Sequence, residues 1–254
     1  MLFRIFYLRI LQARTFKNSS GVIFLCEYAR DRVMSQIGDL SCETALIPHG
    51  VQSRFYRQSN PQRKLESFSI DDPFRLLYVS IVDVYKHQWN VVEAVSQLRC
   101  EGVPVTLDIV GPSYEPALRR LQTTIDKVDS TGDFVRYLGN ISHEELHEVF
   151  ASADGFVFAS TCENFPNILL EAMASGLPIA SSDCRPMTDI LGDNSFVFDP
   201  VNIQSVFNSI CQMVDDYSRR DTISQEVYSR ASRYTWKNCT KATFKFIEEI
   251  ATSK

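Results

Sequence analysis

The chain lacks the features that define several common protein classes. Its seven cysteines are scattered, odd in number and include no Cys-x-x-Cys pair, so the sequence indicates neither a disulfide framework nor a zinc site, and a reduced cytoplasmic setting fits best. No apolar run is long enough to cross a membrane. A Walker loop, a nucleophile elbow and internal repeats are also missing. The sequence therefore predicts a soluble globular protein.

An excess of basic residues is also lacking. The 254 residues contain 26 lysines and arginines against 31 acidic residues, which gives a net charge of −5. This balance argues against general nucleic-acid binding, because that function requires a basic face. Any phosphate site must be local. With 44% hydrophobic residues, the chain can form one large domain or two small ones.

A regular alternation of short apolar strands and helical patterns begins after residue 72. We predict six strands, at residues 75–80, 105–111, 134–139, 155–160, 177–182 and 195–198. Such alternation is typical of an α/β protein with a parallel sheet covered on both faces. Parallel sheets of this kind bind ligands at the carboxyl ends of their strands. The polar residues 52–72, which include Pro61, are predicted to form a linker or long loop.

The segment from Thr161 to Ile179 is the most informative about function. It places Glu163 just before a helix that starts at Pro166, and Glu171 more than a turn inside that helix. The backbone amides and the dipole at the start of a helix favour an anion such as a diphosphate. One carboxylate can then reach a group beyond the phosphates, while the other accepts hydrogen bonds from hydroxyls on the near side. A nucleotide sugar has this order of groups.

The first turn of the predicted sheet has no glycine. It reads SIVDVYKHQWN, from Ser80 to Asn90, so it lacks the Gly-x-Gly-x-x-Gly pattern of a dinucleotide-binding domain. A nicotinamide enzyme is therefore not favoured. The turn instead offers Lys86 at the start of the next helix, where an ammonium group can neutralise a diphosphate.

Together these segments resemble the retaining glycosyltransferases of family 4, which have the two-domain GT-B fold. The resemblance rests on the two glutamates eight residues apart, on the surrounding ENFPN and LLEAMASGLPI, and on the lysine turn. It implies a Rossmann-like, donor-binding C-terminal half. It also implies transfer of a sugar, with retention, from a nucleoside-diphosphate sugar to an acceptor hydroxyl, with no cofactor and no obligatory metal.

The resemblance also implies roles for individual residues. Glu163 and Lys86 become the candidate catalytic residues, with Glu163 on the donor sugar and Lys86 on the leaving diphosphate. The candidate donor-binding residues are Glu171 on the ribose, together with Phe165, Pro166, Asn167, Ser80, Gly111, Gly139, Asn140 and Ile141. Many family members have an arginine where this chain has Ser80 and Ile81. Either one cation serves the diphosphate here, or another group replaces the arginine.

The resemblance further implies that most of an N-terminal domain is missing. Residues 1–52 are interpreted as a remnant of the acceptor domain and the crossover, residues 53–235 as the nucleotide-sugar-binding domain, and residues 236–254 as a helix crossing back. The isolated chain is then expected to be inactive. The alternative is a nucleotide-sugar-binding module that needs a partner or has lost catalysis. A glycan or lipid-linked acceptor, and a role in cell-surface polysaccharide synthesis, follow by analogy.

The first residues, MLFRIFYLRILQARTFK, are apolar and basic. They predict a helix that packs against protein absent from this chain. The alternative is peripheral contact with an anionic membrane surface, which would make a cytoplasmic protein membrane-associated.

A competing motif is the literal His-Glu-x-x-His from His143 to His147, the pattern of zinc proteases. Ser142 and Glu145 form a capping box, however, which places the motif in the first, solvated turn of a helix. No downstream pattern supplies a third ligand. We therefore interpret both histidines as surface residues whose replacement leaves donor binding unchanged, and keep a metalloprotease as a remote alternative.

Overall fold

The structure is a computed structural model that describes residues 2–57 and 61–252, with the backbone only at positions 2, 3 and 5. The chain divides into two compact units. The larger unit is Val51–Arg233, and the smaller unit combines Met1–Gly50 with Tyr234–Lys254.

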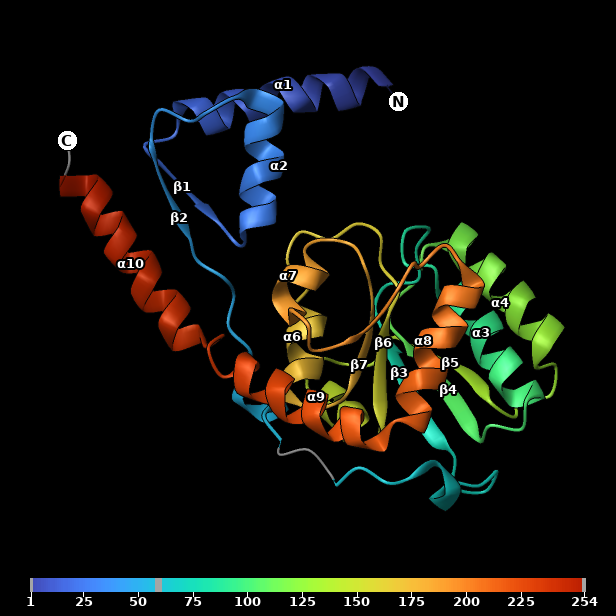
Figure 1. Cartoon of the computed structure of the whole chain (residues 1–254). Helices are drawn as coiled ribbons and strands as arrows, with labels where there is room; N and C mark the ends of the chain where they lie inside the picture. The colour runs from blue at the N-terminus through green and yellow to red at the C-terminus, as the bar shows by residue number, and fades with distance from the viewer. Residues whose placement is uncertain (1, 58–60, 253–254) are drawn as a thin grey trace. The chain divides into compact units, whose positions relative to one another are not determined.

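The larger unit contains a six-stranded sheet in the order β5-β4-β3-β6-β7-β8, in which every neighbouring pair is parallel (Figure 1). The strands are β3 (Phe74–Val79), β4 (Val105–Val110), β5 (Val135–Gly139), β6 (Gly155–Phe158), β7 (Ile179–Ser182) and β8 (Phe196–Phe198). All six predicted strands are thus confirmed, with ends that shift by one or two residues. The strand order reverses between β3 and β6, and at such a switch point ligands bind beyond the carboxyl ends of the strands.

Helices cover both faces of this sheet. They are α3 (Gln88–Cys100), α4 (Glu115–Val128), α5 (Leu146–Ala151), α6 (Asn167–Ala174), α7 (Met187–Leu191), α8 (Ile203–Asp215) and α9 (Tyr217–Ala231). Helix α3 packs against α4 and α8, and α6 packs against α9. Because both faces are covered, the central strands are buried except at Arg75 near the start of β3, and side chains such as Leu77 and Phe156 are shielded from solvent.

The segment predicted as a linker or long loop packs onto the larger unit. It contains two short 3-10 turns, Ser53–Phe55 and Leu65–Ser67. Phe55 and Phe68 are buried, and their rings contact those of Phe150 and Phe74. A single aromatic residue in a polar stretch gives no periodicity, so the sequence pattern did not indicate these anchors.

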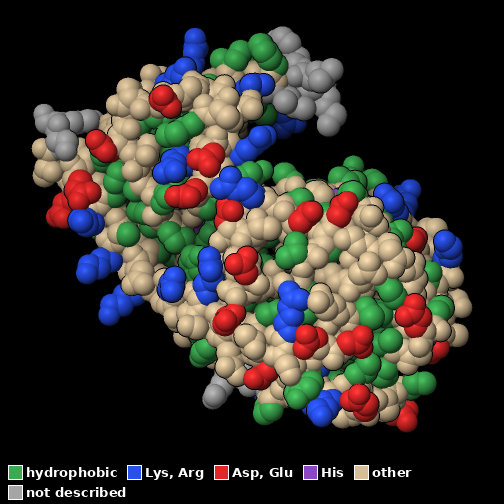
Figure 2. Space-filling model, in the orientation of Figure 1, with side chains coloured by type: hydrophobic (Ala, Val, Ile, Leu, Met, Phe, Trp, Pro, Cys, Tyr) green, Lys and Arg blue, Asp and Glu red, His purple; other side chains and the backbone are tan. Residues whose placement is uncertain are grey.

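The smaller unit contains a parallel pair of strands, β1 (Gly21–Phe24) and β2 (Glu43–Leu46), with helices α1 (Leu2–Asn18), α2 (Glu27–Ile37) and α10 (Trp236–Thr252). Among the described residues, β1 and β2 form hydrogen-bonded ladders only with each other. Large apolar side chains of α1, among them Phe6 and Tyr7, are exposed. Hydrophobic side chains lie on the visible surface of this unit (Figure 2).

Within the described residues, no helix combines the length and the apolar character needed to cross a membrane.

Candidate functional site

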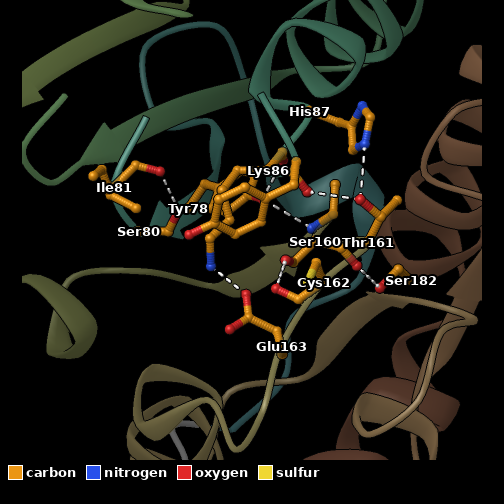
Figure 3. A network of polar contacts seen from close by, with 12 residues as sticks. Tyr78, Ser80, Ile81, Lys86, His87, Ser160, Thr161, Cys162, Glu163 and Ser182 are labelled. Atoms are coloured by element: carbon orange, nitrogen blue, oxygen red, sulfur yellow. Dashed lines mark hydrogen bonds and ion pairs between the residues drawn. The ribbon is translucent and has the colours of Figure 1, made fainter. Parts of the chain in front are cut away.

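A buried ion pair lies beyond the carboxyl ends of β3 and β6. Lys86, in the turn between β3 and α3, donates a hydrogen bond from Nζ to Oε1 of Glu163, which lies in the loop between β6 and α6 (Figure 3). The two side chains are only 7% and 14% exposed. The structure therefore joins the two candidate catalytic residues, which are 77 positions apart in the sequence.

The backbone and side chain of Lys86 are held by the aromatic residues around it. The Tyr78 hydroxyl donates to the Lys86 carbonyl and accepts a 3.1 Å bond from the amide of Ala159. Burial raises the pKa of Tyr78 well above its usual value, so its hydroxyl remains a donor. The Lys86 ammonium lies 4.9 Å from the centre of the Phe158 ring, within cation–π distance. Lys86 is thus positioned before any ligand arrives.

The turn that carries Lys86 also contributes Ser80 and Ile81 to the lining of a cavity of about 390 Å³. Its walls come from the ends of β3, β4 and β5 and from α5 and α6. They are Val79, Ser80, Ile81, Val110, Gly111, Pro112, Asn140, Ile141, Ser142, His143, Leu146 and Ile168. Four predicted donor-binding residues from three separate loops are therefore brought together: Ser80, Gly111, Asn140 and Ile141. Gly139 does not line the cavity, but its carbonyl accepts a 2.8 Å bond from the Gly111 amide.

Gly111 lets the ends of β3 and β4 approach closely. Its φ angle is +139°, a conformation that L side chains rarely adopt, and an added Cβ would lie 2.1 Å from the carbonyl oxygen of Ser80. The Ser80 hydroxyl donates to the Ile81 carbonyl, and the Gln88 amide donates to both groups. The floor of the cavity is therefore a tightly bonded turn.

We expect Gly111→Ala to lower the free energy of unfolding by about 2–4 kcal/mol, because backbone strain adds to steric overlap. Gly102→Ala is the matched control, since Gly102 also has a positive φ, +83°, but open space around it. Strain alone should cost that variant about 1–2 kcal/mol. Urea denaturation would measure both, and equal losses would contradict the close approach.

Glu171 does not line the cavity itself, but it contacts His143, which does. It is buried in α6, and its Oε1 accepts a 2.9 Å hydrogen bond from Nε2 of His143. Its Oε2 is shielded from solvent and has no hydrogen-bond partner among the described residues. Burial raises the pKa of this carboxyl, and the contact with His143 partly opposes the shift. One carboxylate oxygen thus keeps its full capacity to accept hydrogen bonds.

Helix α6 begins one residue later than the sequence predicted. Pro166 precedes the helix with extended backbone, and Asn167 is the first helical residue. Phe165 is buried just before it. The three candidate residues Phe165, Pro166 and Asn167 therefore form the start of the helix that carries Glu171, directly after the loop that carries Glu163.

The interpretation of the His-Glu-x-x-His motif needs one correction. One of the two bonds of the predicted capping box is present, since the Glu145 amide donates to Ser142 Oγ at 3.3 Å, while the Glu145 carboxylate accepts from the Ser142 hydroxyl. Helix α5, however, starts only at Leu146, so His143 lies in the preceding turn. His143 is not a merely solvated residue, because it hydrogen-bonds Glu171 and lines the cavity. The interpretation of His143 as a merely solvated residue is therefore wrong, and the expectation that its replacement leaves donor binding unchanged stays a prediction.

The other histidine of the motif does not take part in this contact. His147 Nδ1 lies 2.8 Å from the carbonyl oxygen of Glu144, and its ring meets the edge of Phe55. Among the described residues, no group of three or more His, Cys, Asp or Glu side chains is placed to hold a metal ion.

Three residues near the site were missed by sequence reasoning: Tyr78, Arg54 and His143 in its contact with Glu171. Arg54 Nη2 lies 3.4 Å from His143 Nδ1. Tyr78 reads as an ordinary strand residue, and Arg54 as one more polar residue of a loop. Neither has a sequence signal, because Tyr78 also depends on Ala159 and Arg54 contacts His143, and both contacts join positions far apart in the chain.

Known proteins share sequence similarity with most of this chain. Residues 61–230 match the family model of the glycosyl transferases group 1. O-antigen chain mannosyltransferase B of Escherichia coli is 33% identical over 229 residues, covering 89% of this chain and 57% of that protein. The GtfA subunit of a UDP-N-acetylglucosamine–peptide N-acetylglucosaminyltransferase from Streptococcus gordonii is 26% identical, covering 92% of this chain and 46% of that protein. The chain spans about half the length of these curated relatives.

Solved structures show the same fold. Pneumococcal O-GlcNAc transferase GtfA, in complex with UDP and GlcNAc, has a TM-score of 0.76 at 22% identity, covering 94% of this chain and 47% of that one. Anabaena Alr3699/HepE, in complex with UDP and glucose, has a TM-score of 0.80 at 20% identity, covering 96% of this chain and 66% of that one. The predicted α/β fold of the GT-B glycosyltransferases is therefore confirmed. From the match over residues 61–230, the chain belongs to the glycosyl transferases group 1 family.

Proposed function

We propose that this chain binds a nucleoside-diphosphate sugar as the donor half of a retaining glycosyltransferase of family 4. The observation that carries the proposal is that two acidic groups each contact a residue or turn at one cavity. Glu163 pairs with Lys86, in the turn whose Ser80 and Ile81 line the cavity, and Glu171, with one unpartnered oxygen, contacts the lining residue His143. The relatives crystallised with UDP and a sugar support this class of ligand.

Each part of the donor can be assigned to residues of this site. The base occupies the cavity near Asn140 and Ile141, and its faces pack on apolar walls such as Leu146. The ribose hydroxyls donate to Glu171. The diphosphate lies between Lys86 and the start of α6, where an ammonium group and a helix N-terminus both favour negative charge. The sugar then reaches Glu163.

The chemistry follows from where charge develops. When the bond between the anomeric carbon and the diphosphate breaks, negative charge grows on the leaving phosphate. The fixed Lys86 ammonium stabilises that charge without needing to reorganise, which is the kind of electrostatic preorganisation that enzymes commonly use. Glu163 orients the sugar. In this proposal Lys86 provides the neutralising charge, so no metal is obligatory.

The acceptor is proposed from the relatives. The Escherichia coli relative is named an O-antigen chain mannosyltransferase, which supports a glycan or lipid-linked acceptor in cell-surface polysaccharide synthesis. We interpret the smaller unit as part of an acceptor-binding domain, because its sheet has only two strands and its helix α1 exposes apolar side chains. Such a protein would act in the cytoplasm, and its basic, apolar helix α1 could also contact the surface of a membrane. The alternative is a nucleotide-sugar-binding module without catalysis of its own.

The test of this assignment is the loss of nucleotide affinity in Glu171→Ala. Removing a hydrogen bond to a charged group costs about 1.5–3 kcal/mol, which corresponds to roughly a 10- to 150-fold weaker dissociation constant. Calorimetric titration with UDP and with GDP measures it. Glu101→Ala, which removes an exposed acid between α3 and the start of β4, away from the carboxyl ends of the strands, is the control and should change affinity little. Unchanged affinity in a folded Glu171→Ala variant would overturn the assignment.

The raised pKa of Glu171 gives the same test a pH dependence. Only the ionised carboxylate accepts freely from both ribose hydroxyls, so affinity should fall as the pH falls through the raised pKa, which lies above the ordinary 4.5. Glu171→Gln should lack this step. The effect of pH on folding has the opposite sign to its effect on binding. The protonated Glu171 carboxyl stabilises the folded state below pH 4.5, its ordinary pKa, and this contribution is lost as the pH rises through the raised pKa.

A further inference from the structure

Three side chains from separate elements form a chain of polar contacts that ends at Glu171. Arg54 comes from the 3-10 turn Ser53–Phe55, His143 from the turn before α5, and Glu171 from α6. Arg54 Nη2 lies 3.4 Å from His143 Nδ1, and His143 Nε2 lies 2.9 Å from Glu171 Oε1. The Phe55 ring packs against the imidazole, with ring centroids 5.4 Å apart. The histidine is therefore held on both of its nitrogens and on one face.

The chemistry of these contacts assigns the tautomer of His143. A guanidinium group has only donors, so Nδ1 must accept from Arg54 and carry no proton. The proton of the neutral ring then lies on Nε2, which donates to the acceptor-only carboxylate of Glu171. The Gln52 side-chain oxygen accepts from Arg54 and holds the guanidinium in turn. Each hydrogen bond in this series therefore runs in the same direction: Arg54 donates to His143, and His143 donates to Glu171.

We infer that His143, held by Arg54, is a positioning residue for the carboxylate that binds the ribose. This inference rests on the proposed function, because it takes Glu171 as the ribose-binding group. The hydrogen bond from Nε2 fixes the rotation of the carboxylate in a buried site and satisfies Oε1. Oε2 is shielded from solvent and has no hydrogen-bond partner among the described residues, so it is a buried acceptor that a ligand hydroxyl would satisfy. His143 and Arg54 also lower the pKa of Glu171, which burial raises, and so they favour its ionised form.

The experiment compares ligands that differ only in the ribose hydroxyls. Dissociation constants for UDP and 2′,3′-dideoxy-UDP, and for the corresponding GDP pair, are measured in the unaltered chain, His143→Ala, His143→Gln and His147→Ala. His147→Ala is the matched control, since His147 belongs to the same motif and also contacts Phe55, but bonds a backbone carbonyl instead of Glu171.

We expect His143→Ala to weaken binding of the natural nucleotide by about 3- to 10-fold, as for loss of one hydrogen bond. The dideoxy ligand should be affected less, so the preference for ribose hydroxyls shrinks. His143→Gln, whose amide nitrogen can donate from nearly the Nε2 position, should restore most of that preference. A merely structural role for His143 would weaken both ligands of a pair equally. His147→Ala should keep the preference of the unaltered chain.

A second readout needs no ligand. Nitrogen-detected NMR of the free chain should show His143 as the Nε2–H tautomer, and Arg54→Ala should mix the tautomers. An Nδ1–H tautomer would overturn the positioning role of His143. So would an unchanged preference for ribose hydroxyls in His143→Ala. A stronger preference in that variant would also overturn it, because it would mean that His143 blocks access to Glu171. Failure of both UDP and GDP to bind the unaltered chain would instead overturn the proposed function, and this role with it.

Discussion

Replacing Lys86 with methionine should lower the free energy of unfolding by about 3–5 kcal/mol, because it leaves the Glu163 carboxylate in a buried site without its counter-charge. Both side chains of the pair lie well below one-fifth exposure, so solvent screens the loss little. Methionine keeps an apolar side chain of similar length but loses the contacts of the Lys86 ammonium with the Phe158 and Tyr85 rings. Urea denaturation, followed by circular dichroism, measures the change.

Two controls separate the ion pair from other effects. The double variant Lys86→Met/Glu163→Gln should recover much of the loss, because no unpaired charge remains. Arg119→Met breaks the exposed pair with Glu115, whose side chains are 75% and 62% exposed, and should change stability by less than about 1 kcal/mol. If the double variant is as unstable as Lys86→Met alone, the ion pair is not what stabilises this turn.

The second large effect concerns transfer itself. We expect this chain alone to bind a nucleotide sugar yet to transfer no sugar, because transfer requires an acceptor hydroxyl held against the anomeric carbon. Such positioning can account for roughly 7–11 kcal/mol of a barrier. We propose that a complete acceptor-binding domain provides it, a proposal supported by the length of the relatives, of which this chain spans about half. Slow hydrolysis of the donor should persist, since water needs no such pocket.

A radiolabelled-sugar assay tests this expectation. Donors would include UDP-glucose, UDP-N-acetylglucosamine and GDP-mannose, offered with oligosaccharide and lipid-linked acceptors, to the chain alone and to the chain co-expressed with an acceptor-binding half. Transfer only in the second case supports the proposal. Robust transfer by the chain alone would show an acceptor site within these residues. Binding without transfer in both cases would favour the alternative of a non-catalytic nucleotide-sugar-binding module.

The sequence predicted the sheet well because each strand carries a local signal. Runs such as Leu76 to Val79 and Phe156 to Phe158 are apolar throughout, and this is what a strand buried on both faces requires. The start of α6 was displaced by one residue because Pro166 is compatible with either the first helical position or the one before it. Such differences at helix ends have little effect on where the functional side chains lie.

The polar contacts within the site could not be predicted in the same way. Lys86 and Glu163 were each identified by a local motif, but their pairing depends on the neighbouring positions of β3 and β6 in the sheet. His143 was identified for another reason, a motif that suggested metal binding. Its contact with Glu171 arises because the turn before α5 lies beside α6. Contacts of this kind depend on tertiary packing, and no periodicity in the sequence reports them.

In the proposed complex, one nucleoside-diphosphate sugar extends from the cavity to the Lys86–Glu163 pair. A crystal structure of the chain with UDP-glucose or GDP-mannose would show whether it does. We predict the base in the cavity beside Ile141, the ribose hydroxyls on Glu171, the diphosphate on Lys86 Nζ and the sugar against Glu163. A nucleotide bound away from this cavity, or bound in it with the diphosphate out of reach of Lys86, would contradict the account.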